Sequence, residues 1–410
     1  MSNTQRLAKS EFIVLMALMT SLIALSIDSM LPAFPQITEA FQLQSAEQLQ
    51  LVIAILFLGF GFGQLLFGPL SDVFGRKPPI YWGIGVFVLG SILSGLTNSF
   101  ELFLLGRFLQ GFGAAAPRII SLALIRDEYS GNAMAQITSL VMTIFILVPA
   151  IAPTLGQAVI YFLNWRAIFI LLFVMGTLLW VWFGFRQPET LPKSSRKKLS
   201  VAQLTFGLKE TLSQPVTLAC ILMSGLLFGI FVGYLGAAQE IFSKLYQVGD
   251  QFPLYFGVLA LSIGGASFFN SRLVMALGMR RLILYAFIFM STLSMLFALY
   301  LTYFKISQPP FSLFMTYMIL NFSSVGFLFG NLNALAMEPL GHIAGIGSAL
   351  IGCIQSTISV AIGVLVGRYF HGSVAPLALG FGAVGITSIL IIHLEKRWAR
   401  APRQEPRPHI

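Results

Sequence analysis

The chain has 410 residues, of which 57% are hydrophobic and only 10% are charged. A soluble domain normally carries about 25% charged residues, so this composition excludes an ordinary soluble domain. Apolar runs of about 20 residues, the length that crosses a bilayer as an α-helix, recur throughout the sequence. The composition therefore predicts an all-α, multi-pass membrane protein.

Twelve spans are expected, with approximate ends. They cover residues 12–32, 50–69, 79–97, 101–124, 135–160, 165–186, 216–239, 253–271, 282–304, 311–335, 345–367 and 374–394. The first run follows two basic residues, as the apolar part of a signal peptide does. However, it has no small-residue cleavage site and eleven spans follow it, so we expect a retained first helix.

The distribution of Lys and Arg predicts the orientation in the membrane. An even number of spans places both termini on one side; nineteen of the 25 basic residues share that side, and four lie on the other. Because basic loops stay in the cytoplasm, we expect both termini there. The net charge of +10 follows from this topology and does not require a nucleic-acid partner.

The longest hydrophilic interval divides the chain into six spans and six spans. The expected divisions are an N-terminal half (1–186), a cytoplasmic central loop (187–215), a C-terminal half (216–394) and a basic cytoplasmic tail (395–410). Residues 75–77 and 278–281 repeat a Gly followed closely by two basic residues at equivalent places in the two halves. The repeat predicts two pseudo-symmetric halves around a central path, although basic loops are common enough to explain it as well.

Asp28 is the only charged residue in the stretch 12–31 (FIVLMALMTSLIALSIDSML). A charge within a span costs roughly 2.5–3.5 kcal/mol, so a functional role is the default interpretation. A carboxyl group in a polar cavity can take up and release a proton, as ion-coupled transport requires. Arg107 is expected at similar depth in the fourth span. We therefore predict proton coupling by Asp28 and Arg107, with a fixed structural ion pair as the alternative.

Arg118 is a second arginine within the fourth span. It lies eleven residues after Arg107, which places both on one helix face about 16 Å apart. Arg118 also follows Pro117, which deprives the Gly113 carbonyl of its helical partner. Two interpretations follow: Arg118 satisfies exposed carbonyls at a kink, or it lines a cavity that favours neutral, zwitterionic or anionic cargo.

Several other polar residues fall within spans. We expect a substrate cavity lined by Arg118, Gln110, Gln136, Asn331, Asn333 and Gln355. Hydrogen bonds between helices, each worth about 0.6 kcal/mol, are the alternative for some of them. The glycines at positions 59 and 63 have the spacing of close helix packing. The two cysteines lie within spans and predict neither a disulfide framework nor a metal site.

The second loop reads GPLSDVFGRKP at residues 68–78, where Gly and Pro favour a tight turn. Asp72 can pair with Arg76 or cap the next helix. The loop closely resembles the signature G-x-L-(S/A)-D-x-x-G-R-(K/R) of the major facilitator superfamily. In that family the motif locks the two halves together on the cytoplasmic side. The resemblance implies a gate at Gly68, Asp72, Gly75 and Arg76, whereas a plain basic turn is the alternative.

Further motifs resemble the same family. Residues 107–111 (RFLQG) resemble the R-x-x-x-G signature of its proton-coupled members. The segment with Pro149, Pro153 and Gly156 resembles the antiporter signature G-P-x-x-G-G, but departs from it at Ala152 and Gln157. Residues 27–32, 123–127 and 331–350 are similar to the bacterial Bcr/CflA group of drug-resistance exporters.

The resemblance implies a major facilitator fold of twelve helices in two six-helix halves. It further implies a monomeric, proton-coupled exporter of small amphipathic molecules in a bacterial inner membrane, working by alternating access without a cofactor. The first alternative is an importer or exporter of an anionic metabolite or siderophore with the same fold. An enzyme fits poorly, because the four histidines are scattered and no nucleophile–base pair, metal-ligand spacing or phosphate loop is present. The gate motif favours a carrier over a channel.

Overall fold

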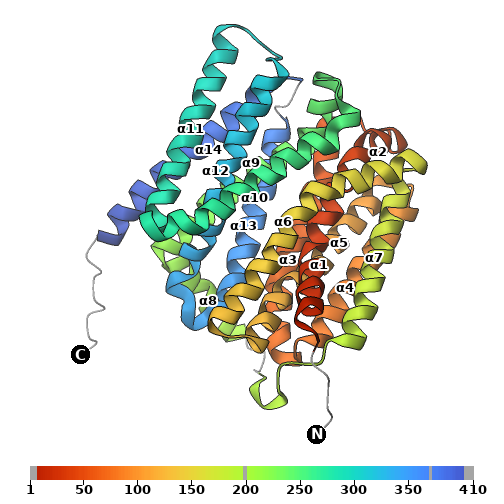
Figure 1. Ribbon diagram of the computed structural model, residues 1–410, viewed down its shortest axis with the longest axis vertical. Helices are drawn as coiled ribbons and strands as arrows, with labels where there is room; N and C mark the ends of the chain where they lie inside the picture. Colours follow the sequence, from red (N-terminus) through yellow and green to blue (C-terminus); the bar gives the residue numbers. More distant parts are fainter. Residues whose placement is uncertain (1–6, 197–200, 369–371, 401–410) are drawn as a thin grey trace.

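The computed structural model describes residues 7–196, 201–368 and 372–400, and none of these residues forms a β-strand. The described chain is almost entirely helical (Figure 1). Its α-helices are α1 (Lys9–Asp28), α2 (Phe34–Ala40), α3 (Ala46–Phe74), α4 (Lys77–Leu96), α5 (Phe100–Glu128), α6 (Gly131–Phe162), α7 (Trp165–Arg186), α8 (Val201–Ser213), α9 (Pro215–Glu240), α10 (Phe252–Leu277), α11 (Met279–Tyr303), α12 (Phe311–Met337), α13 (Ala344–Arg368) and α14 (Ala375–Arg400).

Eleven helical stretches of the described chain are long and apolar enough to cross a membrane. The longest, Phe311–Gly367, has 57 residues, about twice the length of one span. A 3₁₀ turn at Glu338–Ile343 separates α12 from α13 within it. The described residues therefore provide twelve spans, the number predicted from the sequence. We call the side where α1 begins and α14 ends the terminal side, and the other the opposite side.

The interval between the sixth and seventh spans contains a helix that the sequence did not predict. Residues 201–213 form α8, which packs against α9 and the beginning of α13. Gly207 of α8 lies close to the side chains of Ile346 and Leu350 of α13. The sequence of this interval resembles a hydrophilic loop because only one face of the short helix packs against α9 and α13, and most of the described residues on its other faces are exposed.

Close packing of glycines holds the first helices together. A Cβ atom added at Gly59 or Gly63 of α3 would lie against the backbone carbonyl of Phe108 or Phe112 of α5. On the other side of α5, a Cβ atom at Gly83 of α4 would meet the Gly113 carbonyl oxygen at 2.8 Å. The close helix packing predicted for positions 59 and 63 is therefore confirmed.

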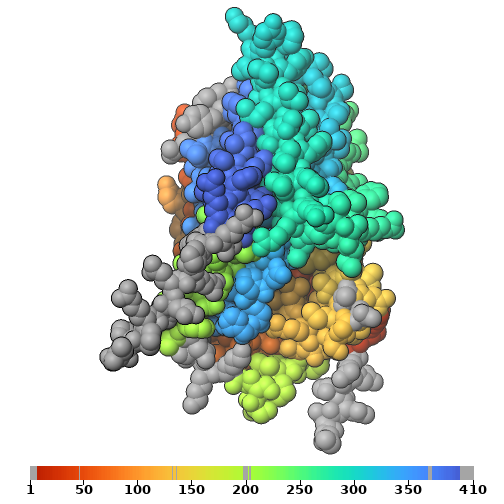
Figure 2. Space-filling model, turned by 90° about the vertical axis from the view of Figure 1, so that its left-hand side faces the viewer, coloured from red at the N-terminus to blue at the C-terminus, as the bar shows by residue number. Residues whose placement is uncertain are grey.

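The first six and last six spans meet mainly along two helix pairs, α3 with α13 and α6 with α10, and α9 also contacts α3. A Cβ atom at Gly61 of α3 would lie 2.9 Å from the Ser356 Cβ atom of α13. A Cβ atom at Gly257 of α10 would lie 3.2 Å from the Ala150 carbonyl oxygen of α6. Among the later helices, α14 (dark blue) packs beside α11 (teal) on the face shown in Figure 2. The contacts between α3 and α13 and between α6 and α10 form the boundary at which a transport path would open.

Candidate transport site

Asp28 is the last residue of α1 and only 5% of its surface is exposed. Within the described part of the chain, its carboxyl group has neither a hydrogen-bond nor an ion-pair partner. The next residue, Ser29, is in backbone contact with Gly156 of α6. The structure thus encloses an acid at the opposite-side end of α1 without neutralising it, a costly arrangement for a carboxylate in a span.

Tyr234 of α9, which belongs to the last six spans, lies near this acid. Its ring is fully buried, and its hydroxyl group has no hydrogen-bond partner within the described chain. Tyr234 lies within electrostatic range of Asp28, and α9 packs against the turn that follows α1. The titratable group therefore sits at the boundary between the two sets of six spans. Sequence reasoning missed Tyr234, because a tyrosine within an apolar span reads as ordinary packing.

Arg107 is fully buried in α5 and is held by neutral acceptors. Its Nη1 atom donates to the Ser26 carbonyl at 3.1 Å and to Gln110 Oε1 at 2.6 Å, while Nε donates to the Val52 carbonyl at 3.4 Å. Arg107 thus reaches the helix that carries Asp28, but the described residues contain no ion pair between the two. The fixed ion pair considered from the sequence is not seen in this conformation.

Two of the residues expected to line the cavity lie inside packed helices instead. Gln110 is fully buried, and its Nε2 atom donates to Ser91 Oγ of α4 at 2.8 Å. Asn331 of α12 is 3% exposed and donates to Asn270 Oδ1 of α10 at 2.7 Å. Both side chains join neighbouring helices, the alternative that the sequence left open.

The remaining expected cavity residues are more dispersed. Gln136 is exposed at the terminal side and accepts a hydrogen bond from Lys9 Nζ at 2.8 Å. Asn333 donates to the Phe329 carbonyl of its own helix at 2.9 Å. Gln355, in the middle of α13, is buried and has no hydrogen-bond partner in the described chain. Arg118 faces α6, as described below.

The loop after α3 is organised around Arg76, which is 4% exposed. Nη1 of Arg76 donates to Asp72 Oδ1 at 2.7 Å and to Ser71 Oγ at 3.0 Å, and Nε donates to Asp127 Oδ2 at 2.8 Å. Burial lowers the pKa of Arg76, but the hydrogen bonds to Asp127 and Asp72 outweigh it, so this pKa lies above its usual value. Arg76 therefore remains a permanent cation between two carboxylates.

Glu189, which follows α7, fixes the backbone of the same loop. Its carboxylate accepts hydrogen bonds from the Arg76 backbone N–H at 2.8 Å and the Lys77 backbone N–H at 3.0 Å, at the beginning of α4. Gly75 has a φ of 96°, and an added Cβ atom would meet the Glu189 carboxylate at 2.5 Å. Sequence reasoning missed Glu189 because it belongs to a distant hydrophilic segment.

The same loop touches the other half of the protein. A Cβ atom at Gly345, in the first turn of α13, would lie 3.6 Å from Asp72 Oδ2. The N-terminal end of a helix carries partial positive charge, which favours a carboxylate there. One turn earlier in α3, a Cβ atom at Gly68 would meet the Ala349 Cβ atom at 3.4 Å. Of the four residues expected to form the gate, Gly68 and Asp72 thus lie where α3 meets α13 on the terminal side, and Gly75 and Arg76 follow directly after α3.

Comparison with known proteins gives the family. The sequence model of the Major Facilitator Superfamily matches residues 16–364. The chain belongs to the major facilitator superfamily. It is a multi-pass membrane transporter and not an enzyme, and both the family and the fold class predicted from the sequence are confirmed.

Two bacterial relatives of this major facilitator extend over nearly the whole chain. The uncharacterized MFS-type transporter YdgK of Bacillus subtilis is 31% identical over 388 residues, which cover 93% of this chain and 94% of the relative. The bicyclomycin resistance protein homolog of Haemophilus influenzae is 28% identical over 380 residues, which cover 92% of this chain and 94% of the relative. The second relative supports the resemblance to the Bcr/CflA group.

The fold also matches a solved major facilitator. The partially occluded, inward-open structure of the xylose transporter XylE from E. coli superposes with a TM-score of 0.72 at 13% sequence identity. The match covers 98% of this chain and 99% of that structure. At this identity the likeness supports the twelve-helix architecture and leaves the cargo open.

Proposed function

We propose that this major facilitator is a proton-coupled exporter of small amphipathic molecules in a bacterial inner membrane, with both termini in the cytoplasm. The observation that carries the proposal is the buried, unpaired carboxyl group of Asp28 at the contact between α1, α6 and α9. A group that is costly to ionise there can bind a proton in one conformation and release it in another. The energy of the proton gradient can then drive cargo outward.

Two other features support export by alternating access. The name of the Haemophilus influenzae relative, a bicyclomycin resistance protein homolog, refers to resistance, which export of the compound would provide. The segment with Pro149, Pro153 and Gly156, which resembles the antiporter signature, lies within α6 beside α1. The gate would consist of Gly68 and Asp72 at the end of α3, which contacts α13, together with Gly75 and Arg76 directly after that helix.

The test of proton coupling is transport by Asp28→Asn in inverted membrane vesicles. Chloramphenicol, ethidium and 1-naphthoate serve as neutral, cationic and anionic probes. Asp28→Asn should abolish proton-driven transport of every probe that the wild type carries, with unchanged membrane insertion and melting temperature. The matched control is Asp250→Asn, because Asp250 is exposed in a turn on the opposite side. Full transport by Asp28→Asn that still collapses with the proton gradient would refute the assignment.

The second candidate is transport of an anionic metabolite or siderophore, inward or outward. The unpaired cation Arg118 favours it. Direction is decided by comparing vesicles of both orientations, because an exporter accumulates cargo in inverted vesicles and an importer in right-side-out vesicles.

A further inference from the structure

Arg118 is a cation without a counterion in the middle of α5. Its guanidinium carbon lies 4.7 Å from the centroid of the Phe145 ring of α6. Its Nη1 atom is completely buried and has no hydrogen-bond partner in the described chain. None of the described acids forms an ion pair with it. Arg118 as a whole is half-buried, but a fully buried donor of a charged group that lacks an acceptor is costly, so this arrangement calls for an anion from elsewhere.

The kink at Pro117 does not explain the position of Arg118. The carbonyl that Pro117 leaves without a helical partner belongs to Gly113, and it points towards Gly83 of α4. Arg118 instead faces Phe145 of α6. No hydrogen bond from Arg118 to a backbone carbonyl occurs in the described chain. Of the two interpretations left open by the sequence, the geometry favours the cavity.

Arg107 shows how the same helix holds an arginine that has several hydrogen-bond acceptors. Through Nε and Nη1, Arg107 donates to two backbone carbonyls and to Gln110, and its buried Nη2 atom has no partner in the described chain. Arg118, in contrast, makes no hydrogen bond within the described chain, and its guanidinium group stacks on the face of the Phe145 ring. A guanidinium group that stacks on a ring keeps its in-plane donors free for the two oxygens of a carboxylate or phosphate.

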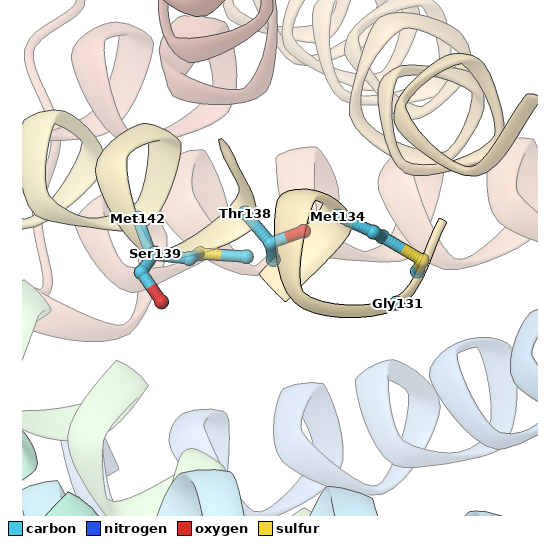
Figure 3. A pocket seen from close by; sticks show the side chains of 5 residues that line it. All are labelled: Gly131, Met134, Thr138, Ser139 and Met142. Atoms are coloured by element: carbon cyan, nitrogen blue, oxygen red, sulfur yellow. The ribbon is translucent and has the colours of Figure 1, made fainter. Parts of the chain in front are cut away.

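An open groove lies along the first turns of α6, on the N-terminal side of Phe145. The α6 groove, a cavity of about 470 Å³, is lined by Gly131, Met134, Thr138, Ser139 and Met142. Figure 3 shows these residues on successive turns of α6, with blue and green ribbon of the C-terminal half across from them. At 100° per residue, Phe145 continues the face formed by Met134, Thr138 and Met142. Two methionines, two hydroxyl groups and a ring suit an apolar body with few polar groups.

We propose that Arg118 and Phe145 form the binding site for the anionic group of the cargo, a carboxylate or phosphate on an aromatic body that lies along the α6 groove. This inference rests on the transport function proposed above and names its substrate class. The oxyanion accepts paired hydrogen bonds from the Arg118 fork, while the aromatic body contacts Phe145 and the methionines. The site lies about three helical turns from Arg107 and is therefore separate from the position of Asp28.

The test is equilibrium binding to the purified full-length protein with four probes of one shape. The anions are 1-naphthoate and 1-naphthyl phosphate, and their partners are cationic 1-naphthylmethylamine and neutral 1-naphthylmethanol. The wild type should prefer at least one anion over both partners. Arg118→Gln should weaken binding of that anion about tenfold to a hundredfold, because hydrogen bonds to a charged group are lost. Arg118→Lys should fall between, because it keeps the charge without the planar fork.

The matched control is Arg272→Gln. Arg272 also stacks on a phenylalanine, Phe268 of α10, at 5.3 Å, but it is exposed. Its loss should leave naphthoate and naphthyl phosphate binding unchanged. The proposal is overturned if the wild type shows no preference for either anion, or if Arg118→Gln binds the anions as the wild type does. Equal loss of all four probes with a lowered melting temperature would also overturn it, since that result indicates a structural role.

Asp28→Asn separates this proposal from the proton-coupling proposal. If only the proton-coupling proposal is wrong, Asp28→Asn transports normally with the proton gradient, whereas Arg118→Gln still loses anion binding. If only the anion-site proposal is wrong, Asp28→Asn loses proton-driven transport, whereas Arg118→Gln binds the anions normally. The preference between carboxylate and phosphate identifies the anionic group of the cargo.

Discussion

Gly156 of α6 packs directly against the carbonyl group of Ser29, the residue that follows Asp28. The two helices are in backbone contact at this point, so any side chain at position 156 would push α6 away from the end of α1. Pro149 and Pro153 precede Gly156 in the same helix. We infer that the segment resembling the antiporter signature keeps α6 against the helix end that carries the titratable acid.

Gly156→Ala should therefore impair transport of every cargo. The added methyl group would overlap the Ser29 carbonyl oxygen, and overpacking of this kind typically costs about 1–3 kcal/mol. Gly85→Ala is the matched control, because a Cβ atom at Gly85 of α4 meets nothing within 4 Å. Alanine is about 1 kcal/mol more favourable than glycine within a helix, so the control should be at least as stable as the wild type. Normal transport and melting temperature in Gly156→Ala would contradict this role.

Tyr234→Phe should affect protein stability and proton coupling in different ways. The Tyr234 hydroxyl group is buried without a hydrogen-bond partner, so its removal should maintain or raise the melting temperature. If the hydroxyl binds the Asp28 carboxyl group during the transport cycle, proton-driven transport should fall about tenfold, the effect expected from loss of a hydrogen bond to a charged group. Transport and melting temperature are measured on the same preparations.

Tyr317→Phe is the control for this prediction. The Tyr317 hydroxyl group is also buried, but it donates to Ser294 Oγ at 3.1 Å within the C-terminal half. Its removal should lower stability by about 1 kcal/mol and leave proton coupling intact. Wild-type transport by Tyr234→Phe at all pH values would show that the hydroxyl group only fills space.

Arg76→Ala and Asp72→Ala should slow transport of all cargoes by a similar factor. Arg76 pairs with both Asp72 and Asp127 at the contact of α3 with α13, away from Arg118 and Asp28. The initial rates of transport of a neutral, a cationic and an anionic compound are compared for each variant. A variant with altered preference among the three and a normal rate would count against a gating role.

The membrane architecture could be predicted from the sequence because the bilayer requires long apolar helices. The predicted first span ended at residue 32 and α1 ends at Asp28, while the last predicted span began at residue 374 and α14 begins at Ala375. The motif also predicted that Asp72 can pair with Arg76, as it does. The predicted loop was wrong at Asp72, because α3 continues through Pro69 to Phe74. These features depend on local sequence and on hydropathy.

The partners of individual polar residues could not be predicted in the same way. Gln110 within a span suits a cavity as well as a buried hydrogen bond, and only the approach of Ser91 on a neighbouring helix decides between them. Tyr234 and Gln50 come near the other half through helix packing that no short motif encodes. The sequence could not predict which way the Arg118 side chain points, because the Pro117 kink explained a buried arginine equally well. Only the position of α6, which carries Phe145, decides it.

Gln50 joins the two halves on the opposite side. It is 2% exposed at the beginning of α3, and its Nε2 atom donates to the Gly233 carbonyl of α9 at 3.3 Å. Its side chain lies directly against Gly236 of α9 and Gly367 of α13. The other end of α3 meets α13 through Asp72. A single helix therefore contacts the C-terminal half at both sides of the membrane.

Gln50→Ala should favour the conformation that opens on the opposite side, because alternating access requires one end of α3 to separate while the other stays closed. Loss of one hydrogen bond, worth about 0.5–1.5 kcal/mol, should change the population ratio roughly twofold to tenfold. Spin labels at Gln44→Cys and Ser307→Cys, both exposed on that side, report the distance between halves after both native cysteines are replaced by serine. Asp72→Asn is the reciprocal control and should shift the distances the other way. Identical distance distributions in the two variants would show that these contacts do not set the conformational balance.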